Sequence, residues 1–278
     1  MKHVIALDIG GTNLRAALVN ETYQIVELVV EPTPLNDLQG FLNQVKKSID
    51  SLIKKQANIS AIACGVPGRV DVLGGIDILP NIGIRNVPLQ SFLETTYRLP
   101  IVIKNDAVMA TVAEGNLGYG KNLESSYFIT ISTGVGAAFI ANHELRHSSE
   151  EAGHMLVPLG SGYEELEKVA SGQGIVQLAA FHGVVVPDAK SFFERYGKGD
   201  PTIKPVFKSW LNYVTNFLKW VDRYYQPKAF ILTGGVMKSK DHFWKELQSA
   251  VPHIPLALAQ FGQDAGIIGA ANLAFSAK

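Results

Sequence analysis

Residues 4–14 read VIALDIGGTNL, and this stretch decides the fold. An apolar run contains one aspartate, passes through two glycines and a threonine, and returns to a second apolar run. The pattern predicts a β-hairpin whose turn lacks side chains, so a phosphate can approach the amides of Gly10, Gly11 and Thr12. Asp8 would stand beside that phosphate, where a carboxylate can hold Mg²⁺ through water. A plain glycine-turn hairpin with a chance aspartate is the alternative.

A second segment, roughly half a chain away, has the same organisation. Residues 128–140 read FITISTGVGAAFI. An apolar run leads to hydroxyl side chains at Ser132 and Thr133, then to Gly134, and a second apolar run follows. Two such hairpins predict a duplicated domain that holds a nucleotide phosphate from both sides.

Both segments resemble the phosphate loops of the actin-like ATPase superfamily. The segment DIGGT (residues 8–12) resembles the corresponding motif of the ROK group of sugar kinases and repressors. Residues 264–271 (DAGIIGAA) are similar to the closing D-A-G-x-x-G-A-A of that family. The resemblance implies an α/β, two-lobed actin-like ATPase (ribonuclease H-like) fold with a duplicated core and an interlobe cleft. We expect a small lobe over residues 1–107, onto which a helix over 264–278 packs, and a large lobe over 108–263, with a hinge near residue 107.

The composition limits the function classes. The 278 residues suffice for two lobes or one large domain, and the formal net charge of +0 does not suggest nucleic acid or an anionic membrane as a partner. Cys64 is the single cysteine, which excludes a disulfide within the chain and a zinc cluster made of cysteines. No signal peptide is visible, and no apolar run approaches the ~18 residues of a membrane span. We therefore expect a cytoplasmic protein.

The segment Lys104-Asn105-Asp106-Ala107 follows an apolar strand and opens a predicted helix. A carboxylate there can accept a proton from a substrate hydroxyl that attacks a phosphate, or it can cap the helix. Together with Glu114, the segment is similar to a stretch of ROK kinases in which the aspartate is the catalytic base and the asparagine binds the sugar. The resemblance thus implies that Asp106 is the general base and that Asn105 is a sugar ligand.

Glu151 and His154 stand three residues apart in the segment EAGH. Such a pair can offer an acceptor and a donor to neighbouring hydroxyls, although a metal pair and an ordinary surface pair are alternatives. The resemblance implies that both contact the sugar. In many ROK proteins the histidine also ligates a zinc, which cysteines just downstream complete.

Here residues 160–167 read GSGYEELE and contain no cysteine, so no zinc is expected. The tail of the motif is retained, because residues 166–172 (LEKVASG) resemble the family's L-E-x-x-A-S-G. The resemblance therefore implies that Glu167 is a further sugar ligand. A solvated helix glutamate is the alternative.

Three further segments complete the expected site. Residues 65–71 (GVPGRVD) resemble a family turn at which Gly68 and Arg69 edge the sugar pocket, although Pro-Gly is also an ordinary turn. Asn81 matches an asparagine in a loop that closes over the sugar. Residues 233–236 (TGGV) resemble a glycine pair that makes room for the nucleoside, with a strand-to-helix turn as the alternative. The expected ATP site comprises Asp8, Gly10, Gly11, Thr12, Asn13, Ser132, Thr133, Gly134, Gly234 and Gly235.

The resemblance implies an ATP-dependent, Mg²⁺-assisted hexose kinase, and we expect it to phosphorylate the 6-hydroxyl of glucose. N-acetylmannosamine, fructose and β-glucosides are alternative acceptors. A sugar-sensing regulator is a further alternative, but ROK repressors carry a DNA-binding segment before the DIGGT-like stretch, which here begins almost at Met1, and a basic patch is lacking. The expected partners are the sugar and ATP. Dimers are common in the family, which leaves monomer and homodimer open.

Overall fold

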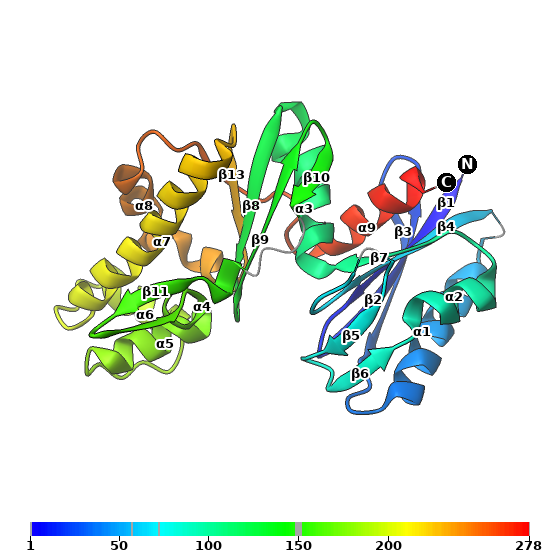
Figure 1. Ribbon diagram of the computed structural model, residues 1–278, viewed down its shortest axis with the longest axis horizontal. Helices are drawn as coiled ribbons and strands as arrows, with labels where there is room; N and C mark the ends of the chain where they lie inside the picture. Colours follow the sequence, from blue (N-terminus) through cyan, green and yellow to red (C-terminus); the bar gives the residue numbers. More distant parts are fainter. Residues whose placement is uncertain (1, 57, 72, 148–151, 278) are drawn as a thin grey trace. The chain divides into compact units, whose positions relative to one another are not determined.

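The structure is a computed structural model that describes residues 2–56, 58–71, 73–147 and 152–277 (Figure 1). The chain forms two compact units. The first unit runs up to Leu117 and resumes at Gln263, and the second unit is Gly118–Gly262. Each unit is built on one five-stranded β-sheet. Among the described residues, no helix combines the length and apolar composition that crossing a membrane requires.

The sheet of the first unit has the strand order β3-β2-β1-β4-β7. These strands are β1 (His3–Ile9), β2 (Asn13–Asn20), β3 (Ile25–Pro32), β4 (Ile59–Val66) and β7 (Ile101–Asn105). β1 and β2 form the expected antiparallel hairpin, with Ile9 opposite Leu14. β4 pairs in parallel with both β1 and β7. The first glycine-rich segment is therefore the turn at one end of the central strand.

The central strand β1 is buried on both faces. The other elements of this unit are α1 (Leu38–Ile53), β5 (Ile76–Leu79), β6 (Ile84–Val87), α2 (Leu89–Tyr97), α3 (Asp106–Asn116), a 3₁₀ turn at Gly262–Asp264 and α9 (Ala265–Ser276). Ile5 and Leu7 belong to a core that they share with α1 and α2. Val4 and Ala6 belong to a second core that they share with α3 and α9. Helices on both faces explain why residues 4–7 are continuously apolar.

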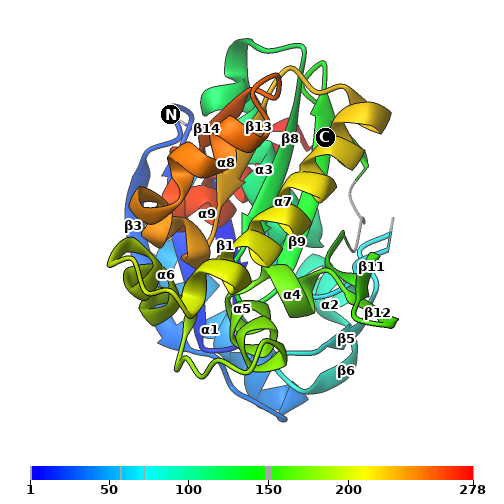
Figure 2. The ribbon, with the colours of Figure 1, turned by 90° about the vertical axis from the view of Figure 1, so that its left-hand side faces the viewer.

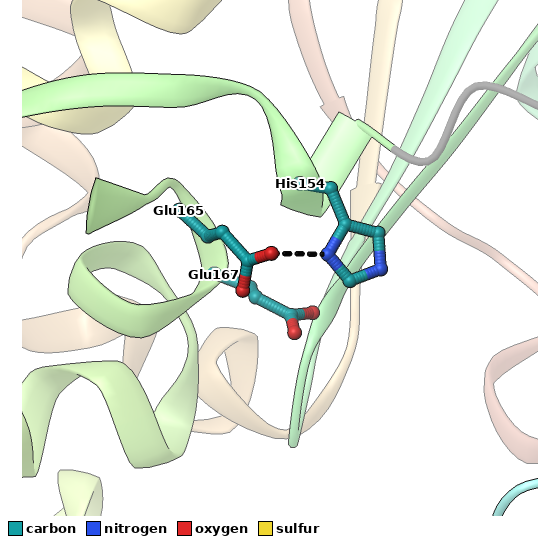
Figure 3. A group of neighbouring side chains, drawn as sticks. All are labelled: His154, Glu165 and Glu167. Carbon is teal, nitrogen blue, oxygen red and sulfur yellow. Dashed lines mark hydrogen bonds and ion pairs between the residues drawn. The ribbon is translucent and has the colours of Figure 1, made fainter. Parts of the chain in front are cut away.

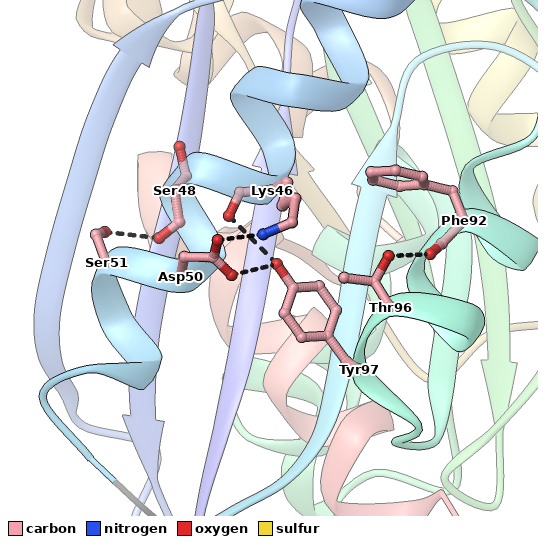
Figure 4. A network of polar contacts seen from close by, with 7 residues as sticks. All are labelled: Lys46, Ser48, Asp50, Ser51, Phe92, Thr96 and Tyr97. Carbon is pink, nitrogen blue, oxygen red and sulfur yellow. Dashed lines mark hydrogen bonds and ion pairs between the residues drawn. The ribbon is translucent and has the colours of Figure 1, made fainter.

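A small polar network joins the two helices on one face of this sheet (Figure 4). The hydroxyl of Tyr97 in α2 has one proton to donate, and its oxygen lies 2.9 Å from Asp50 Oδ1 and 3.2 Å from the Lys46 carbonyl oxygen, both in α1. Lys46 also forms an ion pair with Asp50, one helical turn away. The end of α2 is thereby tied to α1.

Helices α3 and α9 cross with their backbones in close approach at Gly269. A Cβ atom at Gly269 would lie 1.7 Å from the carbonyl oxygen of Met109, so no larger residue fits without a shift of backbone. α9 also packs on β1 and β4. Because α3 packs on α9, the first unit continues through α3 to Leu117, beyond residue 107, where the sequence suggested a hinge.

The sheet of the second unit has the strand order β10-β9-β8-β13-β14. Its strands are β8 (Ser125–Ile131), β9 (Val135–Ala141), β10 (Glu144–His147), β13 (Phe230–Thr233) and β14 (Leu256–Leu258). β8, β9 and β10 pair antiparallel, whereas β13 pairs in parallel with β8 and β14. Both sheets share this order of antiparallel and parallel pairs, which confirms the duplicated core. The second glycine-rich segment is the turn between β8 and β9, equivalent to the first.

Helices of the second unit lie over this sheet (Figure 2), and buried side chains of the described residues form a core with it. The remaining elements are α4 (Glu167–Ala170), α5 (Gly172–Phe181), α6 (Ala189–Gly197), α7 (Ile203–Tyr225), α8 (Trp244–Ala250), the hairpin strands β11 (Leu156–Leu159) and β12 (Gly162–Glu165), and 3₁₀ turns at Tyr119–Asn122, Ala152–His154 and Gly235–His242. Trp210 of α7 is fully buried, and its indole Nε1 donates a hydrogen bond to the Ala170 carbonyl (3.0 Å). This bond fixes α4, which carries Glu167, against the longest helix.

Candidate active site

The first glycine turn is held in shape by its own backbone. The Gly10 amide donates a hydrogen bond to the Asn13 carbonyl (2.9 Å) and closes the turn. Thr33, just after β3, donates from its hydroxyl to the Gly10 carbonyl (2.7 Å) and from its amide to the Thr12 carbonyl (3.1 Å). Thr12 and Asn13 are exposed. The turn is therefore fixed, with its tip open to a ligand.

Two neighbouring turns bring predicted sugar-site residues to this hairpin. A Cβ atom at Gly11 would lie 2.7 Å from the Asn81 carbonyl oxygen, so the two backbones touch. Gly68 has a φ of 85°, and a Cβ atom there would lie 2.9 Å from the ring of Pro80. The amide Nδ2 of Asn105 donates a hydrogen bond to the Gly68 carbonyl (2.9 Å). The structure thus brings together Gly11, Gly68, Asn81 and Asn105, and Arg69 is exposed beside Gly68.

Asn105, rather than Asp106, is the N-cap of α3. Its Oδ1 accepts hydrogen bonds from the amides of Ala107 (2.9 Å) and Val108 (3.4 Å). Asp106 is the first helical residue, and its Oδ1 accepts from the Ala107 amide (2.8 Å). Burial raises the pKa of Asp106, which the Ala107 hydrogen bond only partly offsets. Because Asn105 fills the capping position, the helix does not need the Asp106 carboxylate as its cap.

Asp8 lies among charges of mostly its own sign. Burial raises its pKa to about 6, the negative charges of Asp106 and then Asp264 act in the same direction, and Arg15 opposes them. Arg15 Nη1 lies 3.7 Å from Asp8 Oδ2, and its Nη2 lies 2.5 Å from Asp264 Oδ1. Asp8 and Asp264 thus share one guanidinium, and the negative charge of Asp106 also acts on Asp8. An excess of negative charge carried by oxygen donors is the environment that Mg²⁺ prefers.

The second glycine turn is closed in the same way as the first. The Ser132 amide donates a hydrogen bond to the Gly134 carbonyl (2.9 Å), and the Gly172 amide donates to the Ser132 carbonyl (2.7 Å). A Cβ atom at Gly134 would lie 2.6 Å from Oε2 of Glu167, and one at Gly153 would lie 2.8 Å from the same oxygen. The Glu167 carboxylate is therefore in direct contact with the turn, which a freely solvated helix residue would not be.

His154 and two glutamates gather beside this turn (Figure 3). His154 Nδ1 lies 3.0 Å from Oε1 of Glu165, and ligand atoms of His154, Glu165 and Glu167 all lie within 4.8 Å of one another. The ammonium group of Lys168 lies 3.2 Å from Oε2 of Glu165. This positive charge, which Glu164 shares at 3.2 Å, offsets part of the negative charge beside His154 and would repel a metal ion. Glu151, the expected partner of His154, lies outside the described residues.

The second unit contains a pocket of about 650 Å³ beside the second glycine turn. Residues of the turn, of α5 and of the start of α6 line it: Ser132, Thr133, Gly172, Gln173, Val176, Gln177, Pro187, Asp188, Ala189, Lys190, Gly235 and Val236. Of the predicted glycine pair, Gly235 lines the pocket. Gly234, with a φ of 102°, instead packs against β8, since a Cβ atom there would lie 2.2 Å from the Ile131 carbonyl oxygen.

The sequence analysis did not identify Gln173, Gln177, Asp188 and Lys190, which form much of the pocket wall. Asp188 is the N-cap of α6, and its side chain accepts a hydrogen bond from the Ser191 amide (2.7 Å). An aspartate before a helical pattern is the one local sequence signal at this position. That signal predicts a helix start and says nothing of a ligand. The pocket arises from the packing of α5 and α6 beside β8, and no short motif encodes it.

Comparisons with known proteins place this geometry in a family. The model for the ROK family matches residues 4–277. The chain is 28% identical to a glucokinase of Halalkalibacterium halodurans, over 95% of this chain and 92% of that protein. It is also 28% identical to an N-acetylmannosamine kinase of Salmonella heidelberg, over 97% of both chains.

Solved structures agree with these matches. A ROK hexokinase from Thermus thermophilus has a TM-score of 0.88 at 28% identity, covering 99% of this chain and 98% of that one. A ROK family glucokinase from Streptomyces griseus in complex with glucose and AMPPNP has a TM-score of 0.76 at 27% identity, covering 99% of each. The fold is therefore the mixed α/β, actin-like fold of ROK hexokinase structures. The chain belongs to the ROK family.

Proposed function

We propose that this protein is an ATP-dependent hexose kinase that phosphorylates the 6-hydroxyl of glucose, with Asp106 as the general base. The observation that carries the proposal is the Asp106 carboxylate, half-buried at the start of α3 while Asn105 serves as the cap. Burial raises the pKa of Asp106. A raised pKa makes a carboxylate a better proton acceptor near neutral pH, which is the property that a general base requires.

Residues of both units would bind the sugar. The first unit would supply donors and acceptors from two exposed residues, Arg69 and Asn81, and from two half-buried ones, Gly68 and Asn105. The second unit would supply them from His154 and Glu167. Glu151 is assigned to the same role by its motif alone. Amide, imidazole and carboxylate groups are suited to hydroxyls because together they both donate and accept hydrogen bonds.

The nucleotide would use both glycine turns. The pocket of about 650 Å³ has the size of a small-molecule site, and we assign the adenosine to it, with Ser132, Thr133 and Gly235 in its wall. The amides of residues 10–13 and 132–134 are assigned to the phosphates. The relative from Streptomyces griseus, whose structure holds AMPPNP, supports ATP as the donor.

Asp8 is assigned to Mg²⁺, held through water. Burial first, and then the negative charges of Asp106 and Asp264, raise the pKa of Asp8, and a bound divalent cation would offset the part that comes from these charges. When bound, Mg²⁺ supplies positive charge that stabilises the transferring phosphoryl group. We propose no zinc at His154, because neighbouring cysteines are lacking and Lys168 places a positive charge beside Glu165.

N-acetylmannosamine is the second candidate acceptor, since the chain shares 28% sequence identity with an N-acetylmannosamine kinase and also with a glucokinase. Fructose and β-glucosides are further candidate acceptors. A coupled assay of ADP release, run with ATP and each sugar in turn, decides among them. We expect the largest kcat/KM with glucose, and no ADP release without sugar. ADP formation that is independent of every sugar would contradict the proposal.

A further inference from the structure

Glu165 is bound at both carboxylate oxygens. It ends β12, and its Oε1 lies 3.0 Å from Nδ1 of His154 (Figure 3). Its Oε2 lies 3.2 Å from the ammonium group of Lys168 in α4. The side chain of Glu165 is 29% exposed and that of His154 is 52% exposed. The carboxylate thus connects the imidazole to the helix that carries Glu167.

This contact closes the open end of the β11–β12 hairpin. His154 ends the 3₁₀ turn just before β11, and Glu165 pairs in register with Leu156. The Leu166 amide donates a hydrogen bond to the Met155 carbonyl (2.8 Å) at the same end. Two of the predicted sugar ligands of the second unit, His154 and Glu167, are therefore anchored where the hairpin begins and ends.

The charge state of Glu165 determines which nitrogen of His154 carries a proton. Hydrogen bonds from His154 and Lys168 lower the pKa of Glu165, so the carboxylate is ionised and can only accept. The proton in the His154–Glu165 hydrogen bond is thereby assigned to Nδ1. In a neutral imidazole with a proton on Nδ1, Nε2 is an acceptor.

We propose that Glu165 is a positioning residue for His154: it fixes the ring orientation and the Nδ1–H tautomer, so that Nε2 meets a sugar hydroxyl. Glu165 itself does not contact the sugar. This inference rests on the proposed sugar kinase function, but the contact and its effect on the tautomer can be measured without any reaction.

Glu164 provides a matched control. It is adjacent, has the same charge, and its Oε1 also lies 3.2 Å from the ammonium group of Lys168. Glu164 is not among the described partners of the His154 ring. Glu164→Met therefore removes one charge and one pairing with Lys168, as Glu165→Met does. It also removes the hydrogen bond that the Glu165 amide donates to Glu164 Oε1 (3.0 Å), but it keeps the Glu165 carboxylate that contacts His154.

The experiment compares Glu165→Met, Glu165→Gln and Glu164→Met with the parent enzyme. Methionine keeps the side-chain length without an acceptor, whereas glutamine keeps an acceptor oxygen. We expect Glu165→Met to raise the KM for sugar about tenfold, with kcat and the KM for ATP within about threefold, because one oriented hydrogen bond is lost. Glu165→Gln and Glu164→Met should remain within about threefold in every constant. Thermal melting establishes that each variant is folded, and Glu165→Ala replaces Glu165→Met if the latter is not.

Nitrogen NMR of the His154 ring gives the readout that a merely structural role would not change. The parent enzyme and Glu164→Met should show the Nδ1–H form, and Glu165→Met should lose it. An unchanged tautomer in Glu165→Met, or equal KM effects from Glu164→Met and Glu165→Met, would overturn the inference. If the parent enzyme phosphorylates no sugar, the proposed function is wrong. The NMR result then still tests, independently of any reaction, whether Glu165 sets the tautomer of His154.

Discussion

Gly266, in the first turn of α9, lies directly against the carboxylate of Asp8, at the end of β1. A Cβ atom at Gly266 would lie 2.8 Å from Cγ of Asp8. The C-terminal helix therefore lies next to the proposed Mg²⁺-binding carboxylate. This contact gives a physical reason for the first glycine of the closing DAGIIGAA segment, just as the crossing with Met109 does for the second glycine, Gly269.

Gly266→Ala should displace the Asp8 carboxylate, because two non-bonded carbon atoms do not approach to the 2.8 Å that the new Cβ atom and Asp8 Cγ would have. The displaced group is the end of a short side chain, so the melting temperature should change by no more than a few degrees. The KM for MgATP should rise about tenfold, since Asp8 would leave its place near the phosphates. Steady-state kinetics with varied MgATP measure this effect, and an unchanged KM would separate Asp8 from nucleotide binding.

Gly269→Ala should have the opposite profile. Its new methyl group would meet the backbone of Met109, which cannot move without shifting α3 against α9. We expect the free energy of unfolding to fall by ~1–3 kcal/mol, as overpacked cores typically show. The KM for MgATP, measured on the folded fraction, should match that of the parent enzyme. Denaturant unfolding tests this, and a variant of parental stability would contradict the tight crossing.

Asp8 predicts a specific dependence of stability on pH. Its pKa in the folded protein is about 6, above the usual 3.8, so the folded state binds the proton more tightly than the unfolded state. The stabilisation from the protonated form is fully present below about pH 4 and is lost as the pH rises through about 6. Asp8→Asn should therefore stabilise the protein by roughly 1–3 kcal/mol at pH 7 and by little at pH 4. A difference in unfolding free energy that does not change with pH would contradict the raised pKa.

The purified protein should contain zinc at well below one equivalent per chain. Residues 160–167 offer no cysteine to complete a site with His154, and Lys168 pairs with Glu165. Elemental analysis measures the content directly. Activity should also survive a chelator that spares Mg²⁺. Stoichiometric zinc that is lost when His154 is replaced by alanine would show that the glutamates hold a metal after all.

The features that local patterns determine were predictable from the sequence. The hairpins around Gly10–Thr12 and Ser132–Gly134 follow from apolar runs that flank glycines, and the structure places both turns where they were expected. The start of α3 also followed from Asn105-Asp106. The sequence did not show which of these two residues caps the helix, because asparagine and aspartate cap equally well. Only the side-chain geometry identifies Asn105 as the cap.

The features that depend on tertiary packing could not be predicted. Gln173 and Lys190 line one pocket because α5 and α6 pack together, and no local pattern joins them. The His154–Glu165 hydrogen bond forms across the base of a hairpin, so spacing along the chain does not reveal it. The division after Leu117 likewise depends on the packing of α3 against α9, and no local pattern marks it.

The central claim is that Asp106 removes the proton from the attacking hydroxyl, and Asp106→Asn tests it most directly. Asparagine keeps the size of the side chain and an acceptor for the Ala107 amide, and Asn105 still caps α3, so stability should barely change. Asn105→Ala, which removes the cap, should instead lower stability by ~1 kcal/mol. The Asp106→Asn variant cannot accept a proton, and general-base assistance is typically worth ~10²–10⁴-fold in rate. We predict that kcat falls at least about 100-fold, with the melting temperature and the nucleotide affinity close to those of the parent; a kcat within about threefold of the parent would contradict the account.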